Sequence, residues 1–236
     1  MRGIVVVALS SLAIVGCNSC ATKGKINSVA PAPDTSRMIR VVGRWSTASA
    51  CPIGPRLALT AAHVVDPRPF DNNVGYSPMA FQQGDVIGTF NVATIPKPTP
   101  KNPDAVEYLV SRSRDLAYVN SNVALKGWYP RAEKAPAPGE YVYFYGLDWR
   151  SKSAAFAERV FRAKVIRSVA GILVYEPAGE PGTSGSCVLN EKAEVVAVNT
   201  GGVYVGNSRS LGGLLLPGDE VGIGVGVWES LGSEGN

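Results

Sequence analysis

The stretch Leu57-Ala-Leu-Thr-Ala-Ala-His63 begins as an apolar strand, passes through small residues and ends on an imidazole. The small neighbours leave this imidazole accessible at the end of the strand. His63 is the only histidine among the 236 residues, so a mechanism that needs an imidazole as proton carrier near neutral pH must use it. A histidine in such a place is more often a surface or core residue than a catalyst, so its interpretation depends on the rest of the chain.

An acidic residue precedes a second apolar strand, in Arg114-Asp115-Leu-Ala-Tyr-Val119. An acid before a strand is a common feature of turns. A carboxylate at this position can also accept a hydrogen bond from the Nδ1–H group of an imidazole. That bond would fix the tautomer of the ring and stabilise the imidazolium ion.

A serine surrounded by small residues follows in Pro181-Gly-Thr-Ser-Gly-Ser-Cys187. Clusters of Gly, Ser and Thr often form simple turns. Here the small neighbours also leave the hydroxyl of Ser184 open to a substrate. Gly182 allows the backbone to turn, so the N–H groups of Gly182 and Ser184 can point at one spot and form an oxyanion hole.

The chain as a whole is typical of an all-β protein. Hydrophobic residues make up 45% and charged residues 18%, and glycine and proline are plentiful. Short segments rich in Val, Ile, Tyr and Phe are bounded by turn residues, with no helix between them, which predicts β-barrels or a sandwich. We expect a crossover between two halves at residues 126–139. The expected strands are 39–45, 56–60, 85–95, 105–110, 116–120, 141–145, 159–167, 172–175, 187–189, 194–199, 202–205 and 221–227.

The order His, Asp, Ser is that of the chymotrypsin family, and at this point the sequence resembles the trypsin-like serine proteases. Residues 60–63 match the family's T-A-A-H motif, 115–117 match D-[IL]-A, and 182–185 match G-D-S-G at all but the second position. Segments 138–146 and 194–202 are similar to the first strand of the family's second barrel and to its substrate-binding strand pair.

The resemblance extends over residues 38–228 and implies two antiparallel six-stranded β-barrels with a His63/Asp115/Ser184 triad between them. It places the first barrel at 38–130 and the second at 131–236. It also implies substrate-binding roles for Ala178, Asn199, Thr200 and Gly201. An uncharged Ala178 argues against a trypsin-like preference for Arg or Lys, while Glu180 keeps that preference open.

The sequence departs from the family at two informative positions. Thr183 stands where digestive members carry an aspartate that pairs with a freshly cut N-terminus, so this activation switch is expected to be absent. Cys187 replaces a proline, and the family geometry implies that it approaches Cys51. The two cysteines would then form a disulfide, the alternative being that Cys187 is a small buried hydrophobic residue.

The N-terminus has the features of an export signal. Residues 1–17 have a basic start, a short apolar run and the segment Ile14-Val-Gly-Cys17, which resembles a bacterial lipobox with Cys17 as the lipidated residue. An ordinary signal peptide cut nearby and an uncleaved anchor helix are the alternatives. Residues 18–37 are predicted to form a flexible tether, which would hold the domain at a membrane facing the periplasm or the exterior.

These features together predict a serine endopeptidase that acts on polypeptides and needs no cofactor or metal. The net charge of +4 is modest and the basic residues are scattered, so nucleic-acid binding is not expected. The alternatives are a catalytically silent binding module with the same fold and a structural envelope lipoprotein.

Overall fold

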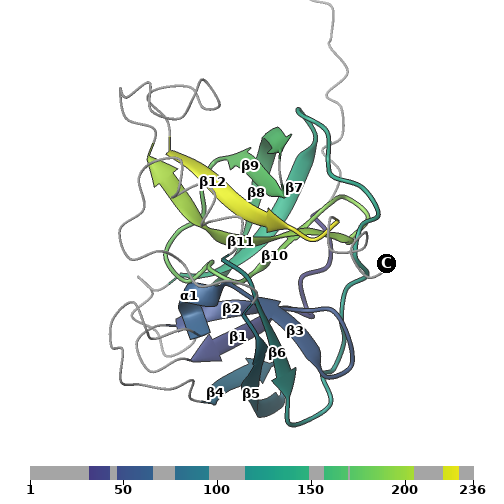
Figure 1. Cartoon of the computed structure of the whole chain (residues 1–236), viewed down its shortest axis with the longest axis vertical. Helices are drawn as coiled ribbons and strands as arrows, with labels where there is room; N and C mark the ends of the chain where they lie inside the picture. The colour runs from purple at the N-terminus through teal and green to yellow at the C-terminus, as the bar shows by residue number, and fades with distance from the viewer. Residues whose placement is uncertain are drawn as a thin grey trace, which may run out of the picture. The chain divides into compact units, whose positions relative to one another are not determined.

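The computed structural model describes residues 32–42, 47–65, 78–95, 115–148, 157–169, 171–204 and 220–228 (Figure 1). The chain divides into Met1–Ala30, which lies outside these ranges, and a second unit, Pro31–Asn236. The predicted strand at 105–110 and the predicted lipidation site Cys17 also lie outside the described residues. No helix within the described ranges is long and apolar enough to cross a membrane.

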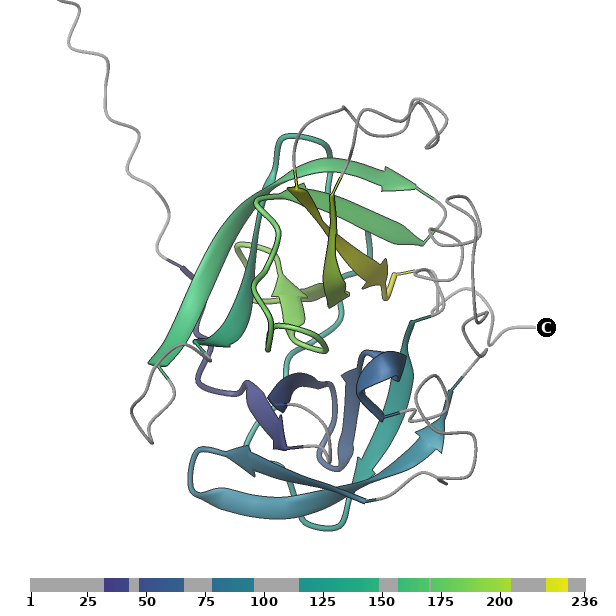
Figure 2. The same cartoon turned by 90° about the vertical axis from the view of Figure 1, so that its left-hand side faces the viewer.

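The first half of Pro31–Asn236 forms a closed antiparallel barrel of six strands in the order β1-β2-β3-β6-β5-β4. A helical turn, α1 (Ala62–Val65), follows β3 directly and lies on the side of this barrel that faces the second barrel (Figure 2). The strands are β1 (Ile39–Val42), β2 (Thr47–Pro52), β3 (Leu57–Thr60), β4 (Met79–Gln83), β5 (Val86–Thr94) and β6 (Ala117–Ser121).

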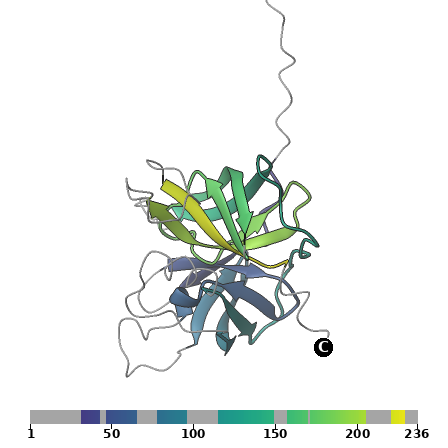
Figure 3. The ribbon, with the colours of Figure 1, turned by 45° about the horizontal axis from the view of Figure 1, so that its top comes forward.

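The second half forms another closed antiparallel barrel of six strands, in the order β10-β11-β12-β9-β8-β7. The predicted fold class, two six-stranded antiparallel barrels, is therefore confirmed. The crossover between β6 and β7 runs along the outside of both barrels (Figures 1 and 3). The strands are β7 (Tyr141–Asp148), β8 (Ala157–Val169), β9 (Ile172–Glu176), β10 (Cys187–Leu189), β11 (Val195–Tyr204) and β12 (Glu220–Gly226).

Several elements differ from the sequence prediction. β2 was not predicted because its residues are mostly small and all but Thr47 are buried, so it shows no alternation of apolar and polar residues. β4 has only two large apolar residues, Met79 and Phe81, and was also missed. The segments predicted at 194–199 and 202–205 form one strand, β11, with an irregularity between Asn199 and Gly201. No helix was predicted, because the four residues of α1 are too few for helical periodicity.

Apolar side chains fill each barrel and also the space between the two barrels. One core contains the stacked rings of Phe81 and Phe90, whose centroids lie 4.2 Å apart, and belongs to the first barrel. A second core surrounds Phe144 in the second barrel. A third joins residues of both barrels, with Cys51 and Leu59 packed in the same cluster as Cys187. This shared core fixes how the two barrels meet.

The described part of the chain begins before the predicted tether ends. Residues 34–37 are held against the crossover, because Tyr129 Oη donates a hydrogen bond to Asp34 O at 2.9 Å and Arg37 donates one to Trp128 O at 2.8 Å. Buried Gln83 donates to the backbone oxygens of both Arg37 and Gly127. The last residues of the predicted tether are therefore bound by polar partners in the crossover, although this segment has no apolar pattern of its own.

Candidate active site

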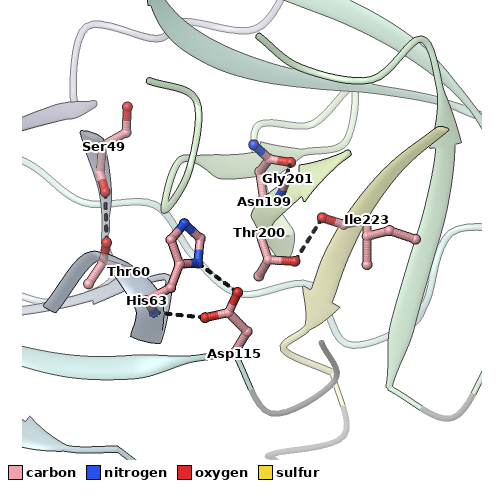
Figure 4. A network of polar contacts seen from close by, with 8 residues as sticks. All are labelled: Ser49, Thr60, His63, Asp115, Asn199, Thr200, Gly201 and Ile223. Atoms are coloured by element: carbon pink, nitrogen blue, oxygen red, sulfur yellow. Dashed lines mark hydrogen bonds and ion pairs between the residues drawn. The ribbon is translucent and has the colours of Figure 1, made fainter. Parts of the chain in front are cut away.

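His63 and Asp115 come together because their strands are neighbours. β3 pairs with β6 with Thr60 opposite Ala117, so the residues just outside the two strands, His63 and Asp115, lie at the same edge of the barrel. His63 Nδ1 lies 2.7 Å from Asp115 Oδ2, and the backbone N–H of His63 donates to Asp115 Oδ1 at 2.9 Å (Figure 4). Both carboxylate oxygens of Asp115 therefore form hydrogen bonds with His63.

The two side chains differ sharply in exposure. Asp115 is 2% exposed, whereas the side chain of His63 is 38% exposed. When the ring is neutral, an Nδ1–H that donates to Asp115 leaves Nε2 without a proton. Nε2 points away from Asp115 (Figure 4). The ring is thus held in the tautomer that can accept a proton at Nε2, and the carboxylate can stabilise the imidazolium ion.

Ser184 lies in a tight turn between β9 and β10. The backbone N–H of Thr183 donates to Glu180 O at 3.1 Å and closes a turn whose central residues are Pro181 and Gly182. Gly182 has a φ of 95°, so proline followed by a left-handed glycine gives the pattern of a type II turn. The sequence of the turn therefore sets the direction of the peptide groups just before Ser184.

The turn around Ser184 is fastened to the first barrel by Ser49 of β2. The backbone N–H of Ser49 donates to Ser184 O at 2.8 Å, and Ser49 Oγ donates to Gly182 O at 3.0 Å. Thr60 Oγ1 in turn donates to Ser49 O at 2.8 Å (Figure 4). Because Thr60 precedes His63 by three positions, Ser49 links the histidine side of the site to the serine side.

The close contact of the Ser184 turn with Ser49 and Thr60 requires a glycine after Ser184. Gly185 has a φ of 85°, and a Cβ atom there would lie 2.1 Å from Ser49 O and 2.2 Å from Thr60 Oγ1. Among the described residues, no hydrogen bond joins the His63 ring to Ser184 Oγ. Sequence reasoning missed Ser49, and the only signal for it was a polar residue between two alanines.

A chain of buried hydrogen bonds lies behind the Ser184 turn. Thr183 Oγ1 donates to Glu180 O at 2.7 Å and accepts a bond from Asn199 Nδ2 at 2.8 Å. Asn199 Oδ1 accepts a bond from the hydroxyl of Tyr175. Thr183, Asn199 and Tyr175 are each 2% exposed or less. Burial raises the pKa of the Tyr175 hydroxyl, so this hydroxyl remains a neutral donor.

The four residues with predicted substrate-binding roles differ in what their side chains do. The side chain of Asn199 is engaged by Tyr175 and Thr183, and Thr200 Oγ1 donates to Ile223 O at 3.1 Å (Figure 4). Gly201 follows them in β11 and is half-buried. Ala178 is half-buried in the loop between β9 and the Ser184 turn.

Glu180, the acidic residue next to this loop, is paired on the surface. Arg159 donates a hydrogen bond to Glu180 Oε1 at 3.1 Å. Its carboxylate therefore already has a cationic partner within the chain.

Cys51 and Cys187 form a disulfide that joins β2 of the first barrel to β10 of the second. The Cα atoms lie 4.7 Å apart, and both residues are fully buried. Cys187 follows Ser184 by three positions and Cys51 follows Ser49 by two. The bridge therefore lies beside the contact that fastens the Ser184 turn.

Comparisons with known proteins find similar folds among solved structures of proteases. No protein-family profile matches the chain, and no curated protein matches it by sequence. A Glu endopeptidase in complex with MPD matches with a TM-score of 0.60 at 13% identity, over 84% of this chain and 88% of that one. A mutant of Rv3671c from M. tuberculosis H37Rv, in its inactive form, matches with a TM-score of 0.56 at 14% identity, over 87% and 95%. A serine protease of human pathogenic astrovirus gives 0.52 at 14% identity, over 81% and 90%. At these identities the matches establish the fold, which is the chymotrypsin-like double barrel of serine proteases.

Proposed function

We propose that the chain is a serine endopeptidase in which Ser184 is the nucleophile, His63 the general base and Asp115 the residue that orients the base. The observation that carries the proposal is the pair of hydrogen bonds from His63 to Asp115, at 2.7 Å and 2.9 Å. The two-barrel fold supports it, because the matching solved structures include serine proteases.

The proposed reaction begins when Ser184 Oγ attacks the carbonyl carbon of a peptide bond. His63 Nε2 takes the Oγ proton as the new C–O bond forms, and the carbonyl electrons move onto the oxygen. The N–H groups of Gly182 and Ser184 donate to this oxyanion, each contributing about 10²–10³ in kcat. Hydrogen bonds between base and nucleophile are often long in free enzymes and tighten when substrate binds.

The intermediate then collapses to an acyl-enzyme. The C–N bond breaks as His63 returns the proton to the leaving amine, and Asp115 holds the ring throughout. A water molecule, deprotonated by His63, attacks the ester and releases the acid and the free Ser184 hydroxyl. The second step repeats the first with water in place of serine, so no other chemical group is needed.

A fluorophosphonate probe on the full chain tests this proposal. We expect covalent labelling of the native protein and none of Ser184→Ala. Ser186→Ala is the matched control, because its hydroxyl is buried and has no hydrogen-bond partner among the described residues. Labelling should survive this change. If the native protein is not labelled and does not hydrolyse denatured casein, the proposal is wrong and a silent binding module with this fold is the better interpretation.

His63→Ala distinguishes the enzyme from a structural envelope lipoprotein. Loss of the general base should abolish casein hydrolysis, since this residue is the chain's only histidine. Hydrolysis that is unchanged in His63→Ala would exclude His63 as the base.

We extend the proposal to specificity, with small or aliphatic residues preferred before the cleaved bond. Ala178 brings no charge to the expected pocket, and the Glu180 carboxylate is paired with Arg159 at 3.1 Å. A substrate library should therefore show no preference for Arg or Lys. Preferential cleavage after Arg that is lost in Glu180→Gln would contradict this assignment.

We also propose that the protein is exported and anchored by lipid on Cys17. Support comes from the lipobox-like segment at 14–17. Each buried methylene group of an acyl chain contributes ~0.8 kcal/mol to membrane binding. One acyl chain therefore binds a membrane only marginally, whereas two or more anchor a protein stably. Radiolabelled palmitate should be incorporated by the native chain expressed in bacteria and not by Cys17→Ser, with Cys20→Ser as the control. Equal labelling of both variants would rule out Cys17.

A further inference from the structure

The residue just before the proposed nucleophile is the centre of a buried polar cluster. Thr183 is 2% exposed, and its hydroxyl has two partners, the carbonyl oxygen of Glu180 and the side-chain amide of Asn199. A threonine hydroxyl has one proton to donate, and here it goes to Glu180 O at 2.7 Å. The backbone N–H of Thr183 donates to the same carbonyl oxygen. The turn that contains Gly182 is therefore closed by two hydrogen bonds, one from the backbone and one from the side chain of Thr183.

Thr183 is also confined by the space around it. A Cβ atom built on Gly146 would lie 2.4 Å from Thr183 Cγ2, and one built on Gly179 would lie 2.4 Å from Thr183 Oγ1. The two glycines thus leave a slot that the threonine side chain fills. Its rotamer is fixed by contacts on both faces, so the hydroxyl has a single orientation toward Glu180.

Asn199 holds the backbone on both sides of Ser184. Its side chain donates to Thr183, one residue before Ser184. Its carbonyl oxygen accepts from Gly185 N at 2.7 Å, and its N–H donates to Ser186 O at 2.9 Å. Asn199 of β11 therefore forms hydrogen bonds with Thr183, Gly185 and Ser186, three of the four residues from 183 to 186.

Tyr175 supports Asn199 from the core of the second barrel. Its hydroxyl donates to Asn199 Oδ1, which leaves the amide nitrogen of Asn199 facing Thr183. The ring is pinned against β12, since a Cβ atom on Gly222 would lie 2.2 Å from Tyr175 Cε2. Every member of the chain Tyr175–Asn199–Thr183–Glu180 O is a neutral group, so the cluster needs no charged partner.

We propose, resting on the function proposed above, that Tyr175, Asn199 and Thr183 are positioning residues that hold the Gly182 N–H where the oxyanion forms. The oxyanion hole is then assembled as soon as the chain folds. No cut at the N-terminus and no ion pair is required to complete it.

The decisive comparison is Thr183→Val against Thr183→Ser in the full chain. Valine keeps the shape and removes the hydroxyl, whereas serine keeps the hydroxyl and removes the methyl group. Removing one oxyanion donor costs about 10²–10³ in kcat, and a misplaced donor should cost about 10-fold or more. We expect Thr183→Val to lower kcat by at least about 10-fold with little change in KM, and Thr183→Ser to recover most of kcat.

A second readout separates this role from general stability. The rate of fluorophosphonate labelling should fall in Thr183→Val by the same factor as kcat, because the phosphoryl oxygen uses the same hole. The pH profile of kcat should keep its shape, since no charged group is removed. Unchanged kcat in Thr183→Val, or an equal loss in Thr183→Ser, would overturn the proposal. Failure of the native protein to react with the probe would instead refute the function on which it rests.

Tyr175→Phe provides a milder variant should Thr183→Val fail to fold. Phenylalanine keeps the packing against Gly222 and removes only the donor to Asn199 Oδ1. We expect a smaller loss of kcat than in Thr183→Val. In the double variant with Thr183→Val and Tyr175→Phe, the loss of kcat should be smaller than the product of the two single losses, because both changes break the same hydrogen-bond network. Losses that multiply, or an unchanged kcat in Tyr175→Phe, would exclude Tyr175 as a positioning residue.

Discussion

Removing the Cys51–Cys187 disulfide should destabilise the protein strongly. The bridge joins residues 136 positions apart in the sequence. In the chain-entropy model, closing a loop of that length in the unfolded chain contributes about 5 kcal/mol at 25 °C. An unfolding entropy of about 2.1 cal/mol/K per residue over the Pro31–Asn236 unit converts this to a fall in Tm of about 12 °C.

Single and double variants together test whether the stabilisation comes from the bridge. Cys51→Ala, Cys187→Ala and the double variant each lose the same closed loop, so all three should unfold at nearly the same urea concentration under non-reducing conditions. All proteins compared carry Cys17→Ser and Cys20→Ser, which prevents disulfide exchange with the N-terminal cysteines. If the two single losses add in the double variant, and reductant does not lower the Tm of the parent, the cysteines are buried thiols and the calculation fails.

Two further predictions concern the nucleophile turn and the dependence of stability on pH. Gly185→Ala should lower the free energy of unfolding by about 1–3 kcal/mol, measured in urea, and should also reduce kcat, because φ is 85° and the new Cβ would meet Ser49 O. Burial raises the pKa of Tyr129 and Tyr175 above the usual value of 10.0, so their stabilising contribution is complete below that pH. Above pH 10.0 the tyrosine hydroxyls lose their protons in the unfolded chain before they do so in the folded protein, so the unfolding free energy should fall by about 1.4 kcal/mol per pH unit for each tyrosine. Urea titrations at several pH values should show a smaller slope in Tyr175→Phe.

Local features of the sequence were sufficient to predict the strands that carry His63 and Asp115. β3 and β6 are short apolar segments that end or begin beside a polar residue, and such segments can be recognised without knowledge of their neighbours. The direct bond between His63 and Asp115 was expected from the roles of the two groups. Its second component, the His63 N–H to Asp115 Oδ1, depends on the turn of α1 and could not be predicted.

The contacts that fasten Ser184 were not predictable from one sequence. Ser49 lies 135 positions before Ser184, in a strand without alternation, and the contact exists only because two barrels meet there. The resemblance implied a substrate-binding role for Asn199, but nothing in the sequence indicated that its side chain forms hydrogen bonds with Tyr175 and Thr183. A buried polar residue can be recognised as such only when its neighbours in space are known.

One strand, β2, determines how the two halves of the proposed active site are placed. Side chains at positions 49 and 51 of a strand point to the same face, and here Ser49 contacts the nucleophile turn while Cys51 bonds to Cys187. Ala50, between them, points into the core of the first barrel. A shift of β2 by one residue would turn Ser49 and Cys51 away from the second barrel together. The disulfide therefore does more than restrict the unfolded chain. Together with the pairing of β2 to β1 and β3, it holds β2 in the register in which Ser49 N–H donates to Ser184 O and Thr60 Oγ1 donates to Ser49 O. Even a variant that regains its stability through other substitutions should, without the bridge, keep a reduced kcat.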